Sequence, residues 1–361
     1  MRSFFKRFVP GWVTVTMVVA LIFAILGVVA RFFTPLADVV NTYVATPIRF
    51  IMAFSTYYIP VSVFEIILIL LIPSVLVAVV LAFLDTSYID NKVRHLFSIV
   101  GVILLLYSGY VAVMGIPYNT TTLDEHLGIN AREDIPKNEL YEAITTVTEK
   151  VNELADKVGR RDGVSYTEYT DEELSDLIVE AYEKVRAEYP FFVNFTTRLK
   201  PVMASGIMSD MGISGIYTYF TGEANVNTSF PDYSFVFTVA HEFAHQRGIN
   251  RENEANFMAF LVLSRSEDTF LQYSAYLNIY EYLSSALYST DKSLYATVSE
   301  SLDSDARADI AAMNAVVREH RDSPLYKLMH DVNDAYLKVN GTEGVVTYGY
   351  VVRLAVAYLT K

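Results

Sequence analysis

Two histidines and a glutamate stand at a spacing typical of metal-dependent hydrolases. The run His241-Glu242-Phe243-Ala244-His245 places two imidazoles at positions i and i+4. If this run is helical, both rings lie on one face and can bind one metal ion. Glu242 then lies close enough to activate a water molecule at the metal. The sequence therefore predicts a catalytic Zn²⁺ site with His241 and His245 as ligands and Glu242 as the general base.

A third ligand is expected from a second helix shortly downstream. Gly248 is expected to end the first helix as a left-handed C-terminal cap, after which the chain can turn back. The apolar helical pattern then resumes beside Glu252 and Glu254. These two glutamates lie two positions apart and cannot face the same way on a helix, so only one can complete the site. A fourth position stays open for water, as catalytic zinc requires.

The segment HEFAHQRGINRENEANFMAF resembles the active-site segment of an uncharacterised bacterial family of membrane-anchored zinc metallopeptidases, as does the stretch 215–227. This resemblance implies hydrophobic N-terminal segments followed by an outside-facing, zincin-like domain. The E-x-E-A-N element is also similar to that of IrrE-like metallopeptidases, in which the second glutamate binds the metal. The similarity implies Glu254 as the third ligand, with Glu252 as the alternative. It implies a reaction type but no substrate.

Other interpretations of the motif start from the same residues. Two histidines in a helix can simply pack or bond to the backbone, but the flank 233–244 is rich in aromatic and β-branched residues and predicts burial. Buried histidines and a buried glutamate are costly unless they are paired or bound to metal. An outer domain that binds a partner, with structural zinc or none, is a further alternative, although a structural site needs no base such as Glu242. A zinc amidase acting on cell-wall material is the third.

Two other groups of residues are expected near the metal. Partial alternation over 213–227 predicts a strand or hairpin, and we expect 221–227 to be an edge strand that binds a peptide backbone by β-augmentation, although a plain structural hairpin is an equal alternative. Its candidate substrate-binding residues are Thr221, Gly222, Glu223, Ala224 and Asn225. Glu223 is also a candidate for supporting the metal site or capping a turn. A Tyr, His or Arg donor would stabilise the oxyanion. The candidates are Tyr348, Arg353, His320 and His330.

Composition indicates a membrane protein. Hydrophobic residues make up 52% of the 361 residues, which is high for a soluble chain. Apolar runs predict three transmembrane helices, at about 9–31, 61–84 and 96–116, and an interfacial segment at 39–58. The chain has no cysteine, which excludes disulfides and thiolate metal sites.

Charge is distributed unevenly along the chain. Residues 1–117 hold 7 Lys and Arg and 4 Asp and Glu, whereas residues 118–361 hold 21 and 37. Such an acidic domain argues against nucleic acid as a partner. Basic residues at 2–7 and 92–94 fall on one side of the membrane if two spans separate them. Three spans then place 118–361 outside the cytoplasmic membrane, where the bilayer and a peptide or protein substrate are the expected partners; four spans would reverse this orientation.

The predicted architecture is therefore a mainly α, membrane-anchored protein in two domains. Residues 1–117 form the membrane domain, and residues 118–361 form a zincin-like α+β domain with a small sheet or hairpin beside the active-site helix. Amphipathic patterns predict helices at 137–158 and 171–189, and further helices are expected at 267–288, 303–320, 324–338 and 348–359. Thr170 and Glu173 have the spacing of a capping box for the second of these.

Overall fold

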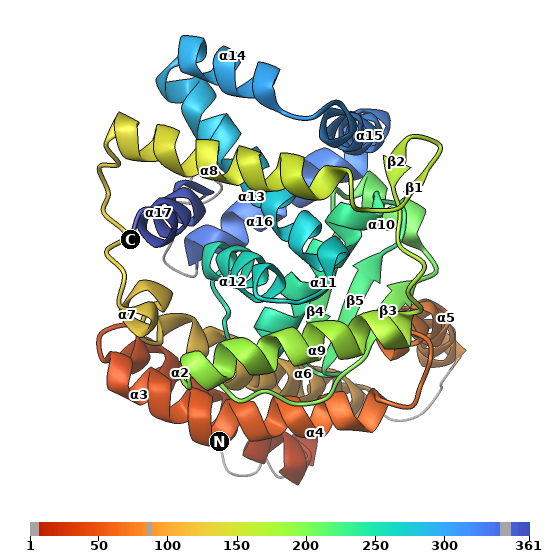
Figure 1. Ribbon diagram of the computed structural model, residues 1–361. Coiled ribbons are helices and arrows are strands. Elements are labelled where there is room, and N and C mark those ends of the chain that lie inside the picture. The colour runs from red at the N-terminus through yellow and green to blue at the C-terminus, as the bar shows by residue number, and fades with distance from the viewer. Residues whose placement is uncertain (1–6, 85–88, 340–347) are drawn as a thin grey trace. The chain divides into compact units, whose positions relative to one another are not determined.

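The computed structural model describes residues 7–84, 89–339 and 348–361 (Figure 1). The chain forms two compact units. Unit 1 comprises Met1–Thr120 together with the short segment Thr218–Gly222, and unit 2 comprises Thr121–Tyr217 and Glu223–Lys361. The described chain is mainly helical with two small sheets, as the sequence predicts.

Unit 1 consists of helices. They are α2 (Gly11–Ala30), α3 (Thr34–Val40), η1 (Asn41–Ala45), α4 (Thr46–Thr56), α5 (Val63–Leu84), α6 (Ile89–Tyr110), η2 (Val111–Gly115) and η3 (Pro117–Asn119). Helices α2 and α6 pack against each other along their length. Gly101 permits this approach, because a Cβ at that position would lie 2.6 Å from the Trp12 ring.

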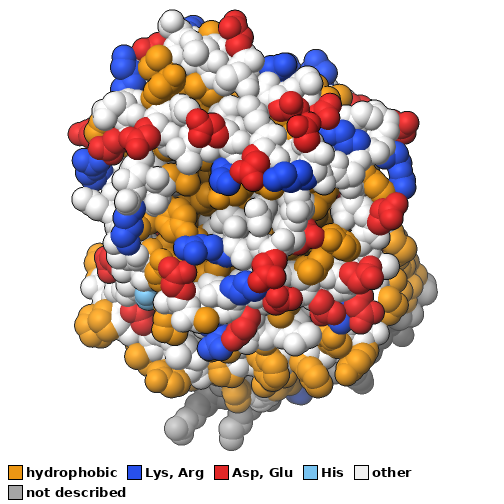
Figure 2. Space-filling view, in the orientation of Figure 1, with side chains coloured by type: hydrophobic (Ala, Val, Ile, Leu, Met, Phe, Trp, Pro, Cys, Tyr) orange, Lys and Arg blue, Asp and Glu red, His pale blue; other side chains and the backbone are white. Residues whose placement is uncertain are grey.

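Two helical segments of unit 1 are long and apolar enough to cross a membrane. They are Gly11–Ala30 and Asn91–Asn119, which overlap the first and third predicted spans. Large apolar side chains such as Val15, Leu21 and Val28 point outward from α2, and hydrophobic side chains predominate over unit 1 on the face shown in Figure 2. Apolar surface of this extent is typical of membrane contact. The chain therefore has features of membrane association.

The other two predicted membrane segments are also helical. Helix α5 covers the second predicted span. The predicted interfacial segment 39–58 lies mostly within the helical run formed by α3, η1 and α4. Arg49 of α4 is fully buried. Its guanidinium donates to Asn41 Oδ1 at 2.9 Å and to the Val113 carbonyl at 2.7 Å, which ties α4 to η2.

Unit 2 surrounds three helices that share one hydrophobic core. Helices α11 (Asp232–Gln246), α12 (Glu252–Ser264) and α13 (Thr269–Thr290) pack against one another. Every residue of α12 from Asn253 to Leu263 is buried, which is expected of a helix enclosed on all sides. The remaining helices are α7 (Leu123–Leu127), α8 (Lys137–Ala155), α9 (Asp171–Glu188), α10 (Ser205–Asp210), α14 (Lys292–Ser301), α15 (Ser304–His320), α16 (Pro324–Val339) and α17 (Tyr348–Leu359).

Local signals account for much of this arrangement. The capping box predicted at Thr170 is present, since its side chain accepts from the Glu173 N–H and the Glu173 side chain accepts from the Thr170 N–H. Acidic and basic side chains are interspersed over unit 2 on the face shown in Figure 2. The outward faces of its amphipathic helices are thus those of a solvated protein surface.

A three-stranded sheet with the order β3-β5-β4 lies against α11. Strand β3 (Leu199–Val202) pairs in parallel with β5 (Glu223–Asn227), with Leu199 opposite Ala224. Strand β4 (Gly215–Thr218) borders the other side of β5. The prediction that 221–227 forms an edge strand is therefore wrong. Strand β5 is central, and all five of its residues are buried, so both of its sides are already used.

Candidate metal centre

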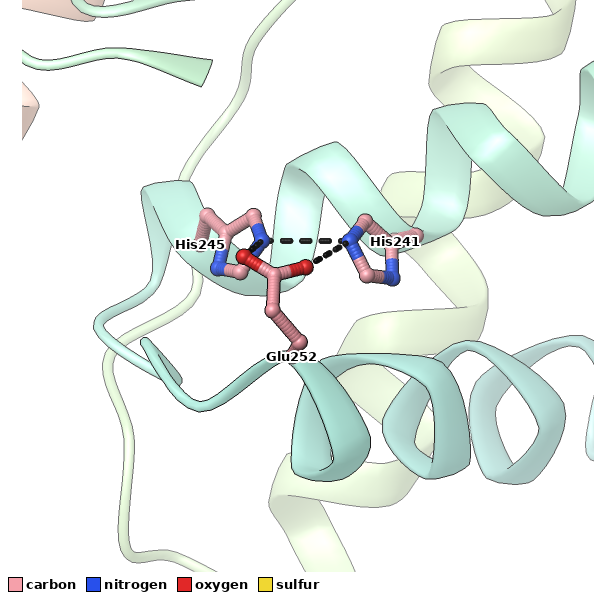
Figure 3. A group of neighbouring side chains, drawn as sticks. All are labelled: His241, His245 and Glu252. Atoms are coloured by element: carbon pink, nitrogen blue, oxygen red, sulfur yellow. Dashed lines mark hydrogen bonds and ion pairs between the residues drawn. The ribbon is translucent and has the colours of Figure 1, made fainter. Parts of the chain in front are cut away.

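Three side chains, His241, His245 and Glu252, form a cluster between α11 and α12. His241 and His245 project from α11, and Glu252 is the first residue of α12 (Figure 3). The two Nε2 atoms lie 3.1 Å apart. Glu252 Oε2 lies 3.2 Å from His241 Nε2, and its Oε1 lies 3.5 Å from His245 Nε2. Potential ligand atoms of three residues therefore lie close to one another.

These separations fit a tetrahedral metal ion. Bonds of about 2.0–2.1 Å at tetrahedral angles place neighbouring ligand atoms about 3.3 Å apart. The two Nε2 atoms lie 3.1 Å apart, and each lies 3.2 or 3.5 Å from its nearer Glu252 oxygen, close to that value. Two imidazoles and one carboxylate also form a donor set found at catalytic zinc, which keeps its fourth position for water. The residues present therefore fit a zinc ion.

The turn after α11 orients one of the imidazoles. Gly248 has φ +93°, its N–H donates to the His245 carbonyl at 3.0 Å, and the Ile249 N–H donates to the Ala244 carbonyl at 3.1 Å. This is a Schellman motif, and the predicted glycine cap is confirmed. The turn brings the Ile249 carbonyl to 2.9 Å from His245 Nδ1. Because Nδ1 then carries the hydrogen, the Nε2 lone pair of His245 points into the cluster. His241 Nδ1 is buried and has no partner within the described residues.

The cluster also has the electrostatics of a cation site. Burial alone would raise the pKa of Glu252, but His245 and His241 hold the pKa of that carboxylate well below its ordinary value. Burial opposes a charged imidazolium at His245, yet the Glu252 carboxylate outweighs this effect and raises the pKa of His245 to about 9. The three side chains thus favour one positive charge among them, which a proton or a metal ion supplies.

Glu242 lies beside the cluster on the side that faces β4. Its side chain is only 4% exposed, and it accepts a hydrogen bond from the Tyr217 backbone N–H. Its Oε2 atom is buried and has no hydrogen-bond partner within the described residues. Burial raises the pKa of this carboxyl despite the two nearby histidines. An unpartnered carboxylate oxygen with raised basicity is suited to accept a proton from water.

Gly215 makes this arrangement possible. A Cβ at position 215 would lie 2.5 Å from Glu242 Oε1 and 2.7 Å from Thr238 Cγ2. Only glycine therefore lets β4 pass so close to the carboxylate. Gly215 and Tyr217 belong to the stretch that carries the family resemblance, but neither was predicted as a site residue from the sequence.

The structure does not bring Glu254, the predicted third ligand, to the histidines. Its Oε1 accepts from Arg251 Nη1 at 2.7 Å and from the Leu123 backbone N–H at 3.2 Å. Residues two positions apart on an α-helix point about 200° apart. When Glu252 faces α11, Glu254 must therefore face α7 and the Arg251 side chain. Glu252, the alternative ligand, takes the place assigned to Glu254.

Neighbours that the motif does not reveal hold α11 in place. Arg247 is buried, with its guanidinium carbon 4.2 Å from the centre of the Tyr182 ring. It donates to Asn194 Oδ1 at 2.8 Å and to the Phe195 carbonyl at 3.0 Å. The Tyr182 hydroxyl donates to the Ala240 carbonyl at 2.7 Å, one residue before the first histidine. These contacts connect α11 to α9 and to the segment that follows α9.

The remaining predicted site residues lie elsewhere or are not described. Thr221 and Gly222 belong to unit 1, and Glu223, Ala224 and Asn225 are buried in β5. His330 is exposed beside Asp331, and His320 Nδ1 lies 2.8 Å from Asp210 Oδ1. Arg353 lies over the Tyr350 ring in α17. Tyr348 begins α17, but its side chain lies outside the described residues. The described contacts therefore bring none of these four oxyanion candidates to the cluster.

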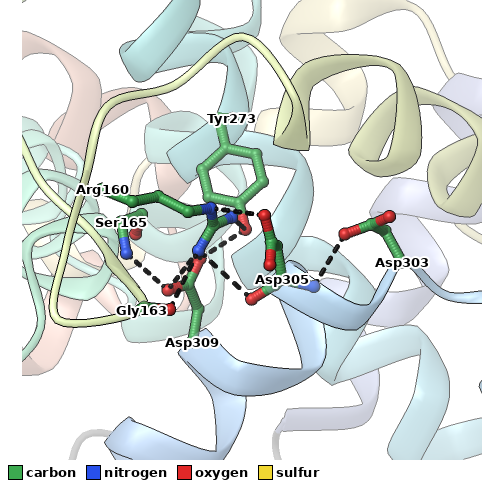
Figure 4. Close-up of polar contacts among 7 residues, drawn as sticks. All are labelled: Arg160, Gly163, Ser165, Tyr273, Asp303, Asp305 and Asp309. Atoms are coloured by element: carbon green, nitrogen blue, oxygen red, sulfur yellow. Dashed lines mark hydrogen bonds and ion pairs between the residues drawn. The ribbon is translucent and has the colours of Figure 1, made fainter.

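A second buried polar cluster in unit 2 has no open ligand position. Asp309 of α15 is fully buried and accepts from the Ser165 N–H at 2.7 Å, from Arg160 at 3.3 Å and from the Tyr273 hydroxyl (Figure 4). Arg160 also pairs with Asp305 at 2.9 Å. The cluster joins the β1–β2 hairpin (Arg160–Arg161 and Val164–Ser165) to α15 and α13. Its role is therefore structural.

A cavity of about 510 Å³ lies among α13, α14 and α15. Glu281, Tyr288, Tyr295 and Arg307 are among its lining residues, and none of the residues of the histidine cluster is. Glu281 accepts a hydrogen bond from the Tyr233 hydroxyl at 3.0 Å. Burial raises the pKa of Glu281 to about 7. This cavity is separate from the candidate metal centre.

Comparison with known proteins yields a family. No curated protein and no solved structure matches the chain. One family, described as "Protein of unknown function (DUF3810)", matches residues 39–356, a range that contains α11, α12 and β4. Since this match covers most of the sequence, the chain belongs to the DUF3810 family.

Proposed function

We propose that this protein is a zinc-dependent hydrolase, most specifically a metallopeptidase. One observation carries the proposal: a buried carboxylate, Glu242, has an unpartnered oxygen beside three converging ligands, His241, His245 and Glu252. A structural zinc site has no use for such a base, and it would usually be closed by a fourth protein ligand. Two residues of β4, Gly215 and Tyr217, also hold the Glu242 side chain in place.

Each residue has a distinct task in the proposed reaction. His241, His245 and Glu252 would hold the ion, and His245 is oriented by the Ile249 carbonyl. Zinc, when bound, polarises the scissile carbonyl and acidifies water. Glu242 would take a proton from the attacking water and then deliver it to the leaving amine. The raised pKa of Glu242 favours the first step, because a more basic carboxylate accepts a proton from water more readily.

Strand β4 is the best placed element for binding a substrate backbone. It is a terminal strand of the sheet as described, and it passes directly over Glu242 at Gly215. Ile216, the next residue, has an exposed side chain. An extended peptide that paired with β4 would lie across the general base. This role replaces the one that the sequence suggested for 221–225.

The proposal is tested with the purified full-length protein in detergent. We expect about one zinc per chain by elemental analysis, and hydrolysis of members of a peptide library. Glu242→Gln should retain zinc and lose at least about 100-fold in kcat, as general-base removal typically does. Glu281→Gln, which changes a buried glutamate outside the cluster, is the matched control and should retain activity.

The outcome also separates the competing functions. A folded protein that binds no zinc even when zinc is supplied would refute the proposal. If the wild type and Glu242→Gln bind zinc equally and neither hydrolyses any peptide, the result would favour a binding module with a structural metal. Turnover of cell-wall amides but not of peptides would keep the site and change the bond.

A further inference from the structure

The turn that joins the two strands beside the active-site helix belongs to the other unit. Strand β4 ends at Thr218 and β5 begins at Glu223, yet Thr218–Gly222 packs with the helices of unit 1. The turn is tightly closed: the Gly222 N–H donates to the Thr218 carbonyl at 2.7 Å, and the Thr221 N–H donates to the same carbonyl at 3.2 Å. A movement of this turn would therefore move the end of β4.

Gly222 lies directly on the backbone of α4. It has φ +70°, and a Cβ there would lie 2.3 Å from the Ala53 nitrogen and 2.5 Å from the Met52 carbonyl carbon. Backbone atoms of a helix cannot move aside as a flexible side chain can. Thr56 Oγ1 of the same helix donates to the Thr221 carbonyl at 3.4 Å. The turn and α4 therefore meet at a fixed distance that only glycine permits.

Two aromatic residues attach the same turn to two further helices. The Tyr219 hydroxyl donates to the Leu106 carbonyl of α6 at 2.8 Å. Its ring would lie 3.2 Å from a Cβ at Gly109, and it packs edge-on against Tyr110. Phe220 packs edge-on against Phe64 of α5, with ring centres 5.9 Å apart. Helices α4, α5 and α6 thus all contact the turn Thr218–Gly222.

The turn lies a short way along β4 from the general base. Gly215, which borders the Glu242 carboxyl, is three residues from Thr218. Three residues of strand span about 10 Å. Tyr217, whose N–H binds Glu242, is the residue immediately before the turn. A displacement of the turn would reach the Glu242 side chain through these two contacts.

We propose that the turn Thr218–Gly222 is a positioning element for catalysis, through which the unit 1 helices α4, α5 and α6 determine the placement of β4 against Glu242. Gly222 and Tyr219 are its positioning residues, and neither contacts the reacting atoms. The inference rests on the proposed hydrolase. On this proposal the zinc ligands alone do not give full activity. The contacts of α4, α5 and α6 with the turn are also required.

Gly222→Ala in the full-length protein tests this proposal. The added Cβ clashes with the α4 backbone, so the turn must move. We expect kcat to fall about 10- to 100-fold, as displacement of a catalytic group by about 1 Å can cause, with KM changed less and zinc content unchanged. The matched control is Gly163→Ala in the β1–β2 hairpin. It imposes a similar backbone strain at φ +81° but has no atom within 4 Å of the new Cβ, and it should retain the wild-type kcat.

Two further measurements keep the result decisive. Tyr219→Phe removes only the hydroxyl that binds Leu106 and should lower kcat several-fold without loss of zinc; this variant decides the case if Gly222→Ala does not fold. Hydrogen exchange should show faster exchange of residues 215–218 in Gly222→Ala than in Gly163→Ala. An active wild type with unchanged kcat in both turn variants would overturn the inference. An inactive wild type whose β4 still loses protection in Gly222→Ala would count against the hydrolase but would support the positioning role.

Discussion

Separate replacement of Glu252 and Glu254 by alanine tests the assignment of the third ligand. The two residues share the first turn of α12 but face different partners: Glu252 faces the histidines, and Glu254 faces Arg251 and the Leu123 N–H. We expect Glu252→Ala to weaken zinc binding. We expect Glu254→Ala to destabilise the fold and leave zinc binding intact.

The structure sets the size of each effect. Loss of a residue that only supports a metal ligand costs about 10- to 100-fold in affinity, so loss of Glu252 itself should cost about 100-fold or more. Zinc at about 1,000 times its Kd stabilises the wild type by about 4 kcal/mol, and the same concentration would stabilise a variant with 100-fold weaker binding by only about 1.4 kcal/mol. Glu254→Ala removes the carboxylate that pairs with Arg251 and leaves the buried Leu123 N–H unpaired. Because the Arg251 side chain is 20% exposed, we take a cost of about 2–3 kcal/mol, below that of a fully buried pair.

Thermal unfolding with and without zinc measures both quantities. For a domain of this size, 1 kcal/mol shifts Tm by about 2–4 °C. Glu254→Ala should therefore lower the metal-free Tm by about 4–12 °C and keep the zinc-dependent rise. Glu252→Ala should lose most of that rise, and its metal-free Tm should fall to the extent that the histidines lose their carboxylate partner. The reverse pattern, with zinc response lost in Glu254→Ala and kept in Glu252→Ala, would refute the geometric assignment and restore the ligand implied by the E-x-E-A-N resemblance.

Three further changes give independent checks. Gly215→Ala should place its Cβ against Glu242 and lower kcat about 10-fold or more, while elemental analysis shows unchanged zinc. Glu281 has a folded pKa of about 7 against an ordinary 4.5, so its stabilising effect is complete below about pH 4.5 and is lost as pH rises through 7. Glu281→Gln should therefore raise the unfolding free energy at pH 8 by up to about 3 kcal/mol, which is measured as a higher Tm. At pH 4 the Tm should stay nearly unchanged. Asp309→Ala should lower the unfolding free energy by about 3–5 kcal/mol in a denaturant titration, because it leaves Arg160 without its buried partner.

Features controlled by short stretches of chain could be predicted from the sequence. The capping box at Thr170, the glycine turn at Gly248 and the i, i+4 pair of histidines all depend on residues within one or two helical turns. Helical periodicity has the same local origin, and it places α8, α9 and α13 close to their predicted ranges. The sheet is different, because its order depends on which strands meet. Strand β5 pairs with Leu199–Val202, more than twenty residues earlier, and nothing within 221–227 shows that both of its sides are occupied.

The same distinction explains why the candidate metal ligands are only partly predictable from the sequence. The helical repeat alone sets the relation between His241 and His245. The choice between Glu252 and Glu254 depends instead on the rotation of α12 about its axis. An amphipathic helix would reveal that rotation through its polar face, but α12 is buried on all sides from Asn253 to Leu263 and has no such face. The rotation is settled by contacts outside the segment. Among them is the Leu123 N–H, which lies 131 positions away in the chain and donates a hydrogen bond to Glu254 Oε1. A carboxylate so engaged would have to break that bond and its bond to Arg251 to reach a metal, whereas Glu252 already lies beside both histidines.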